Sequence, residues 1–164
     1  MGEPALKSFR KLYHHGRIVD DLAAAMAAME RDLGVTWAPV RTFDPIRVWL
    51  PATEGDAGGW SEARIAVTYS RQGPIHFELI EILAPGAYDA LRAVSSDHVG
   101  AWVDNVGDEV ETLVADGWTL IAAGASPKHR YGQMAYLSKD GGPVLELVGE
   151  AIRPMIEEWI AASQ

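Results

Sequence analysis

Cysteine is absent from this 164-residue chain, which excludes a disulfide framework, a thiolate zinc site and a cysteine nucleophile. Basic residues are also few, since 14 Lys and Arg face 23 Asp and Glu, for a formal net charge of -9. They are scattered, whereas nucleic-acid binders need clustered cations to displace phosphate counterions. No apolar run approaches the roughly 20 residues of a membrane span, and the N-terminus lacks a signal-peptide pattern. We therefore expect a cytoplasmic protein that binds neither nucleic acid nor membrane.

The composition suits one compact folding unit. The chain is 48% hydrophobic and 23% charged, which is typical of a globular protein. A domain of about 150 residues buries roughly 70% of the surface that its unfolded chain exposes. We therefore expect a single domain over residues 1–164 that needs no metal or partner merely to fold.

The sequence contains an internal repeat. Residues 14–22 (HHGRIVDDL) and 98–106 (HVGAWVDNV) share His, Gly, Val and Asp at identical spacing, 84 residues apart. Each copy closes on a Glu-Leu segment, around Glu78 in the first and Glu146 in the second, 68 residues apart. The first copy is therefore 16 residues longer, and we place this excess in residues 51–60 (PATEGDAGGW), whose Pro, Gly and Asp content predicts an exposed loop.

Each copy predicts the order strand, helix, strand, strand, strand. Apolar residues at three-to-four-residue spacing predict helices over 21–33 and 105–116, with Asp20 or Asp21 and Asp104 or Asn105 as N-caps. Gly34 and Gly117 would end them in the left-handed conformation. The resulting organisation is module one at about 12–84, with strands 12–19, 46–50, 64–69 and 75–81; a linker helix at about 86–94; module two at about 97–149, with later strands 120–122, 133–137 and 144–148; and a C-terminal helix at about 151–162.

Four side chains are expected to converge. Alternate residues of a strand share a face, and the repeat makes His14 equivalent to His98 and Glu78 equivalent to Glu146. If the sheets of the two modules curl toward each other, these side chains meet in one cavity. Two imidazoles and two carboxylates suit a divalent ion such as Zn, Ni, Co, Mn or Fe. Buried carboxylates are costly without such a partner, so the sequence predicts a metal site.

The pattern resembles the vicinal oxygen chelate superfamily, which includes glyoxalase I, methylmalonyl-CoA epimerase, extradiol dioxygenases, fosfomycin-resistance enzymes and bleomycin-binding proteins. The resemblance covers residues 12–149 and is carried by the paired His-x-Gly openings and the Glu-Leu strands, above all HVGAWVDN (98–105) and AYLSKDGGPVLEL (135–147). It implies an α+β, glyoxalase-like fold in which two tandem βαβββ modules form a curled mixed sheet cup. It also implies that His14, Glu78, His98 and Glu146 hold the ion.

The resemblance further implies the chemistry. The lead hypothesis is a metal-dependent lyase or isomerase of glyoxalase or epimerase type, which removes a proton next to a carbonyl and stabilises the enolate oxygens on the ion. Glu146 is the candidate base, and an epimerase needs a second one, for which Glu62 and then Glu54 are the nearest carboxylates, although neither aligns cleanly with the epimerase pattern. The expected substrate is a small carbonyl compound, possibly a thioester, contacted by His76, His129 and Arg130. A homodimer is expected, with the site either within one chain or at the interface.

Two alternatives use the same scaffold. A small-molecule binding protein of the bleomycin-resistance type typically lacks the four ligands, so their presence disfavours it. An extradiol-type dioxygenase with Fe(II) normally needs two His and one Glu, and Glu78 would crowd its open positions. One fold hosts many reactions, so kinship of fold cannot choose among these activities.

Overall fold

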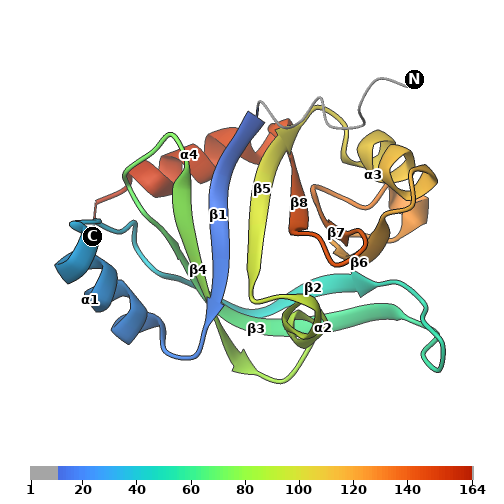
Figure 1. The fold of residues 1–164 in the computed structure, drawn as a ribbon, viewed down its shortest axis with the longest axis horizontal. Coiled ribbons are helices and arrows are strands. Elements are labelled where there is room, and N and C mark those ends of the chain that lie inside the picture. The colour runs from blue at the N-terminus through green and yellow to red at the C-terminus, as the bar shows by residue number, and fades with distance from the viewer. Residues whose placement is uncertain (1–10, 164) are drawn as a thin grey trace.

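The computed structural model describes residues 11–163 and contains one eight-stranded sheet that closes into a barrel in the order β1-β4-β3-β2-β6-β7-β8-β5 (Figure 1). Two βαβββ modules follow each other along the chain, joined by α2, which confirms the predicted α+β class. The elements are β1 (Leu12–Val19), α1 (Leu22–Leu33), β2 (Arg41–Leu50), β3 (Gly59–Tyr69), β4 (His76–Ala84), α2 (Tyr88–Val94), β5 (Asp97–Val103), α3 (Val106–Ala115), β6 (Thr119–Ala123), β7 (Met134–Ser138), β8 (Val144–Gly149) and α4 (Arg153–Ala161), with single 3-10 turns at Pro127–His129 and Glu150–Ile152.

The two modules are joined along their first strands. β1 pairs with β4 in parallel, β5 pairs with β8 in parallel, and β1 and β5 run antiparallel side by side (Figure 1). On the far side of the barrel β2 meets β6 through a single residue pair, Trp49 with Ala123. The cup is therefore closed within one chain, and the repeat in the sequence appears as a repeat in space.

The equivalent helices α1 and α3 begin with the same device. The side chains of Asp21 and Asn105 accept hydrogen bonds from the backbone amides of Ala24 and Asp108, as N-caps do. Gly34 then leaves α1 at φ 69° and Gly117 follows α3 at φ 90°, in the left-handed region that costs glycine little. Both pairs of predicted helix signals are confirmed.

The predicted loop at 51–60 is wrong in extent, because most of the extra length of module one lies in strands. β2 and β3 have 10 and 11 residues, whereas β6 and β7 have 5 each, and the hairpin loop is confined to residues 51–58. Trp60 lies on β3 opposite Trp49, with ring centroids 5.8 Å apart. This cross-strand aromatic pair extends the hairpin past the Gly-rich segment that suggested a loop.

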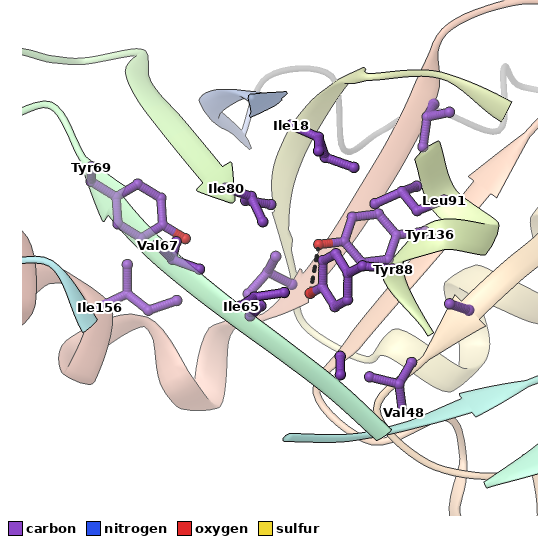
Figure 2. Close-up of a cluster of buried hydrophobic side chains, with 14 of the residues drawn as sticks. Ile18, Val48, Ile65, Val67, Tyr69, Ile80, Tyr88, Leu91, Tyr136 and Ile156 are labelled. Carbon is purple, nitrogen blue, oxygen red and sulfur yellow. Dashed lines mark hydrogen bonds between the residues drawn. The ribbon is translucent and has the colours of Figure 1, made fainter. Parts of the chain in front are cut away.

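The interior of the barrel is packed with apolar side chains (Figure 2). The strands contribute residues such as Val48, Ile65 and Ile80 to this interior. The helices contribute further buried side chains, which are Tyr88 and Leu91 from α2 and Ile156, Trp159 and Ile160 from α4. Outside the barrel, α3 packs on β6, β7 and β8 while α1 covers β3 and β4. Within residues 11–163 no helix is long and apolar enough to cross a membrane.

Candidate metal centre

The pairing of β1 with β5 places each histidine opposite the glycine of the other module. His14 lies across from Gly100, and Gly16 lies across from His98. A Cβ added to Gly100 would lie 1.9 Å from Cε1 of His14, and a Cβ added to Gly16 would lie 1.9 Å from Cε1 of His98. Each His-x-Gly motif therefore supplies one imidazole and the space for the other one. This spatial reason for the motif could not be seen from the spacing alone.

The glutamates approach from the strands that flank this pair. Glu78 on β4 is the register partner of Gly16, and Glu146 on β8 is the register partner of Gly100. All four side chains of the cluster are buried, with residue exposures of 1% to 6%. We call His14, Glu78, His98 and Glu146 the His/Glu cluster. The fold brings together the four residues that the sequence predicts as ligands, and their binding of an ion stays a prediction.

The ligand-type atoms of the His/Glu cluster lie within 4.8 Å of one another. Nε2 of His14 is 3.0 Å from Nε2 of His98 and 2.9 Å from Oε2 of Glu146. Nε2 of His98 is 3.1 Å from the same Oε2 and 3.3 Å from Oε1 of Glu78, which lies 3.9 Å from Nε2 of His14. The two imidazoles and both carboxylates thus face one small volume.

The charges in this volume are strongly coupled. Burial by itself raises the pKa of Glu146, but the two neighbouring imidazoles outweigh it and hold the pKa at about 2. Burial also lowers the pKa of His98, yet Glu146 and Glu78 outweigh it and raise the pKa to about 10. In the absence of an ion, a proton on His98 therefore partly offsets the two buried carboxylates.

The donor set fits a divalent cation. Ligands at about 2.1 Å from an ion are roughly 3.0–3.4 Å apart in octahedral or tetrahedral geometry, close to the 2.9–3.9 Å separations of the cluster. Oε1 of Glu78 and Oε2 of Glu146 are buried and have no hydrogen bond of acceptable geometry. Buried acceptors of this kind are rare without a partner, and a cation would satisfy both. The four residues could therefore hold a divalent metal ion.

The structure does not bring the other predicted site residues into the cluster. Glu62 lies on β3, where successive side chains point in opposite directions. Ala63 faces the interior, so Glu62 points outward, and its side chain is 60% exposed beside Arg64. Arg130 forms ion pairs with Asp108 and Glu111 of α3, and His129 is exposed.

His76 is the nearest of these residues to the cluster. It lies beside His14 on the neighbouring strand, half-buried, with Nδ1 2.7 Å from the carbonyl oxygen of Ser70. Contact with a substrate stays a prediction for His76, His129 and Arg130.

Sequence reasoning missed a group of buried tyrosines around the cluster. Tyr69 is the cross-strand partner of Glu78, and Tyr136 is the cross-strand partner of Glu146, so these two tyrosines obey the repeat. Burial raises the pKa of both phenols above the ordinary value, and the carboxylates add to this effect. The repeat itself was the signal that could have found them, since each tyrosine precedes its glutamate by nine or ten residues.

A fold irregularity adds Tyr13 to the same interior. The register of β1 with β5 shifts between Leu12 and His14, so Tyr13 bulges out of the pairing. Successive residues of a regular strand point to opposite faces, yet Tyr13 and His14 are both buried, and their rings are 4.4 Å apart. The hydroxyl of Tyr13 is buried and makes no hydrogen bond of ordinary geometry, with only a weaker contact to the phenol of Tyr69.

Side chains of α4 cover this region. Trp159 contacts Tyr69 with ring centroids 5.0 Å apart, and Tyr69 in turn lies 5.8 Å from the ring of His14. Nε1 of Trp159 donates to the carbonyl of Pro39 at 2.7 Å. Two surface cavities of about 300 and 510 Å³ lie elsewhere, beside the β2–β3 hairpin and β6, and neither is lined by the cluster.

Comparison with known proteins bears on the fold. The chain is similar to a hypothetical protein from Bacillus halodurans C-125, with 16% identity, a TM-score of 0.53 and coverage of 85% of this chain and 94% of that one. Methylmalonyl-CoA epimerase from Mycobacterium tuberculosis shares 14% identity at a TM-score of 0.54, covering 92% and 95% of the two chains. A mutant of 4-hydroxymandelate synthase from Streptomyces coelicolor shares 14% identity at a TM-score of 0.53, covering 84% of this chain and 48% of that one. No curated protein matches by sequence.

These identities establish a common fold and not a common activity. The sequence evidence is more direct, because the family model described as Glyoxalase/Bleomycin resistance protein/Dioxygenase superfamily matches residues 13–137. That range spans β1 to β7 and includes three of the four residues of the His/Glu cluster. The chain therefore belongs to the Glyoxalase/Bleomycin resistance protein/Dioxygenase superfamily.

Proposed function

We propose that this protein is a metal-dependent lyase or isomerase of glyoxalase or epimerase type, which removes a proton next to a carbonyl group. The observation that carries the proposal is the His/Glu cluster, because two imidazoles and two carboxylates converge in a buried volume of the right size for one divalent ion. A bound ion would supply Lewis-acid stabilisation of negative charge that develops on a carbonyl oxygen. Four protein donors leave up to two positions of an octahedron for oxygen atoms.

The chain's own residues have separate tasks in this proposal. His14, His98 and Glu78 would hold and orient the ion, while Glu146 would also accept the proton. The imidazoles keep the Glu146 carboxylate ionised, as a base must be, but the low pKa also makes it a weak base, so a bound ion would have to increase the acidity of the substrate's C–H group. Packed apolar and aromatic side chains exclude water and strengthen the electrostatic interactions within the cup.

The proposed substrate class is a small carbonyl compound or a thioester. The neighbour from Mycobacterium tuberculosis is named for methylmalonyl-CoA, which is a thioester, and this supports testing that class first. Glu62 stays a prediction as the second base, and its exposed position makes Glu62→Gln an informative variant: unchanged turnover would remove it from the mechanism. A homodimer also stays a prediction. One chain provides all four donors, so the proposed metal site does not require a second copy.

The decisive experiment is elemental analysis of purified, tag-free protein beside the double variant His14→Ala/His98→Ala. We expect one divalent ion per chain in the wild type and loss of this ion in the variant. Asp97→Ala is a matched control, because its partly exposed carboxylate lies next to His98 in sequence but outside the cluster. Equal metal content in all three proteins would refute the coordination.

The second step is a substrate screen of the metal-loaded protein with α-keto hemithioacetals, acyl thioesters that have an acidic α-proton, and catechols. We expect turnover with one of the first two classes and its loss in Glu146→Gln. Turnover of catechols alone would instead assign the dioxygenase activity. A metal-free wild type that binds small molecules tightly would assign the protein to the binding proteins of this fold.

A further inference from the structure

Tyr13 has an unusual position beside the His/Glu cluster. The bulge in β1 turns its side chain into the barrel, where the residue is 6% exposed. Its ring stacks on Trp102 with centroids 3.8 Å apart and planes 12° apart, and it meets the ring of His14 nearly edge-on. The phenol is therefore held in place from two sides, and its direction is set by packing.

Within residues 11–163 the hydroxyl of Tyr13 makes no hydrogen bond of ordinary geometry, and the phenol of Tyr69 offers it only a weaker contact. A buried polar group without a partner destabilises a protein, so such groups are uncommon and call for an explanation. The three other buried side-chain atoms without a hydrogen bond of acceptable geometry in that part of the chain are Nδ1 of His14, Oε1 of Glu78 and Oε2 of Glu146. All four orphaned atoms thus belong to the cluster or to the residue next to it.

Other tyrosines in the barrel show that burial alone does not produce this situation. The hydroxyls of Tyr88 and Tyr136 lie 3.3 Å apart and form a hydrogen bond (Figure 2). Tyr88 is 7% exposed and Tyr136 is 2% exposed, which is comparable to Tyr13. Tyr136 also borders the cluster, opposite Glu146, so the fold gives one phenol beside the cluster a hydrogen bond of ordinary geometry and leaves that of Tyr13 without one.

We propose that the hydroxyl of Tyr13 donates a hydrogen bond to the oxygen ligand, water or substrate, that lies beside the ion in the His/Glu cluster. The proposal rests on the proposed function, because it assigns a partner within the same site. It deepens that function by naming a neutral donor for an anionic oxygen, in addition to the cation. The preferred ligand is then one that offers a negatively charged oxygen and tolerates a hydrogen bond from the side of β1.

Three proteins test the assignment: wild type, Tyr13→Phe, and Tyr88→Phe as the matched control. Each is loaded with Co²⁺, whose visible absorption reports its ligands, and titrated with oxalate as a probe that has two adjacent anionic oxygens. We expect one Co²⁺ per chain in all three. Because one hydrogen bond to a charged oxygen is lost, oxalate should bind Tyr13→Phe about tenfold or more weakly, while Tyr88→Phe stays within twofold of wild type.

Thermal unfolding of the metal-free proteins provides a second readout, in which Tyr13→Phe is not expected to show a loss although it binds oxalate more weakly. Removal of an orphaned hydroxyl should leave the Tm of Tyr13→Phe unchanged or raise it by about 2–4 °C, whereas loss of a paired hydroxyl should lower that of Tyr88→Phe. A purely structural tyrosine would lower the Tm without a specific loss of oxalate binding. Should Tyr13→Phe not fold, Tyr13→Leu keeps the site apolar without a hydroxyl and takes its place.

The outcomes separate the two hypotheses. Failure of the wild type to bind Co²⁺ would overturn the proposed function, and this inference with it. Bound Co²⁺ with equal oxalate affinity in wild type and Tyr13→Phe would overturn only the role of Tyr13. Bound Co²⁺ that takes no oxalate in the wild type would also overturn that role, because the ion would then have no exchangeable ligand for the hydroxyl to contact.

Discussion

Substitution of Gly100 by alanine tests the geometry of the metal centre without touching a ligand. The new Cβ would lie 1.9 Å from Cε1, 2.3 Å from Nδ1 and 2.4 Å from Nε2 of His14. Carbon atoms in contact are ordinarily about 3.5–4.0 Å apart, so the imidazole must move by about 1.6 Å or more. Gly100 does not adopt a positive φ, and the effect therefore comes from lost space and not from backbone strain.

The expected magnitude follows from that displacement. Metal ligands tolerate about 0.2 Å, so a shift of about 1.6 Å removes His14 from coordination. Disturbing only an outer partner of a ligand costs about 10–100-fold in affinity, and we expect Gly100→Ala to weaken metal binding by about 100-fold or more. Overpacking costs about 1–3 kcal/mol of unfolding free energy, partly offset by the reduced entropy of the unfolded chain.

The assay is a competition titration with a chromophoric zinc chelator, together with urea unfolding of the metal-free protein. Gly124→Ala is the control, because its nearest non-neighbouring atom would be 3.5 Å from the new Cβ, which is an ordinary contact. Gly16→Ala should reproduce the Gly100→Ala result through His98. If Gly100→Ala binds zinc within threefold of wild type, the reciprocal seating of the histidines is refuted.

Three further predictions concern pH, the C-terminal helix and a helix cap. Because the pKa of His98 is raised to about 10, metal binding must displace a proton from this imidazole. Zinc affinity should therefore rise about tenfold per pH unit between pH 6 and 8. A zinc affinity that does not change with pH in buffered titrations would contradict the charge coupling. Trp159→Ala should lower the unfolding free energy by about 3–5 kcal/mol in urea melts, because it removes a buried ring and the hydrogen bond to Pro39. Met155 on the same helix is 53% exposed, so Met155→Ala should change the unfolding free energy by no more than about 0.5 kcal/mol. Similar losses for both variants would show that α4 is not packed as described. Asn105→Ala should cost about 1 kcal/mol in the same assay and Asn105→Asp almost nothing, and equal effects would argue against the cap.

The symmetric parts of the molecule could be predicted from the sequence, because the same signal occurs at equivalent positions of both modules. His14 with His98, Glu78 with Glu146, and the caps at Asp21 and Asn105 are each supported by an equivalent position. The prediction of β1 over 12–19 also agrees with Leu12–Val19, since residues 14, 16 and 18 are buried in alternation with their neighbours from residue 15 onward. Agreement between independent signals is what makes such predictions reliable.

The asymmetric parts could not be predicted in this way. Arg41 to Pro45 extend β2, although the Asp44-Pro45 pair is typical of a turn, because the pair lies at a register shift where neither residue is paired with β3. The bulge at Tyr13 breaks the two-residue period, so the strand pattern could not place its ring in the barrel. The resemblance predicts a second base shortly before the third strand, but the outward direction of Glu62 depends on the register of β3, which the extended hairpin sets.

The reciprocal seating of the histidines has a consequence for how the two halves can diverge. A side chain at position 100 is excluded only while an imidazole occupies position 14, and the same holds for positions 16 and 98. When a lineage loses one of these histidines, the glycine opposite it in the other module is no longer required. We therefore expect position 14 to covary with position 100, and position 98 with position 16. Homologues that have abandoned the ion should therefore carry larger residues at both glycine positions, and sequence surveys can identify them by this exchange.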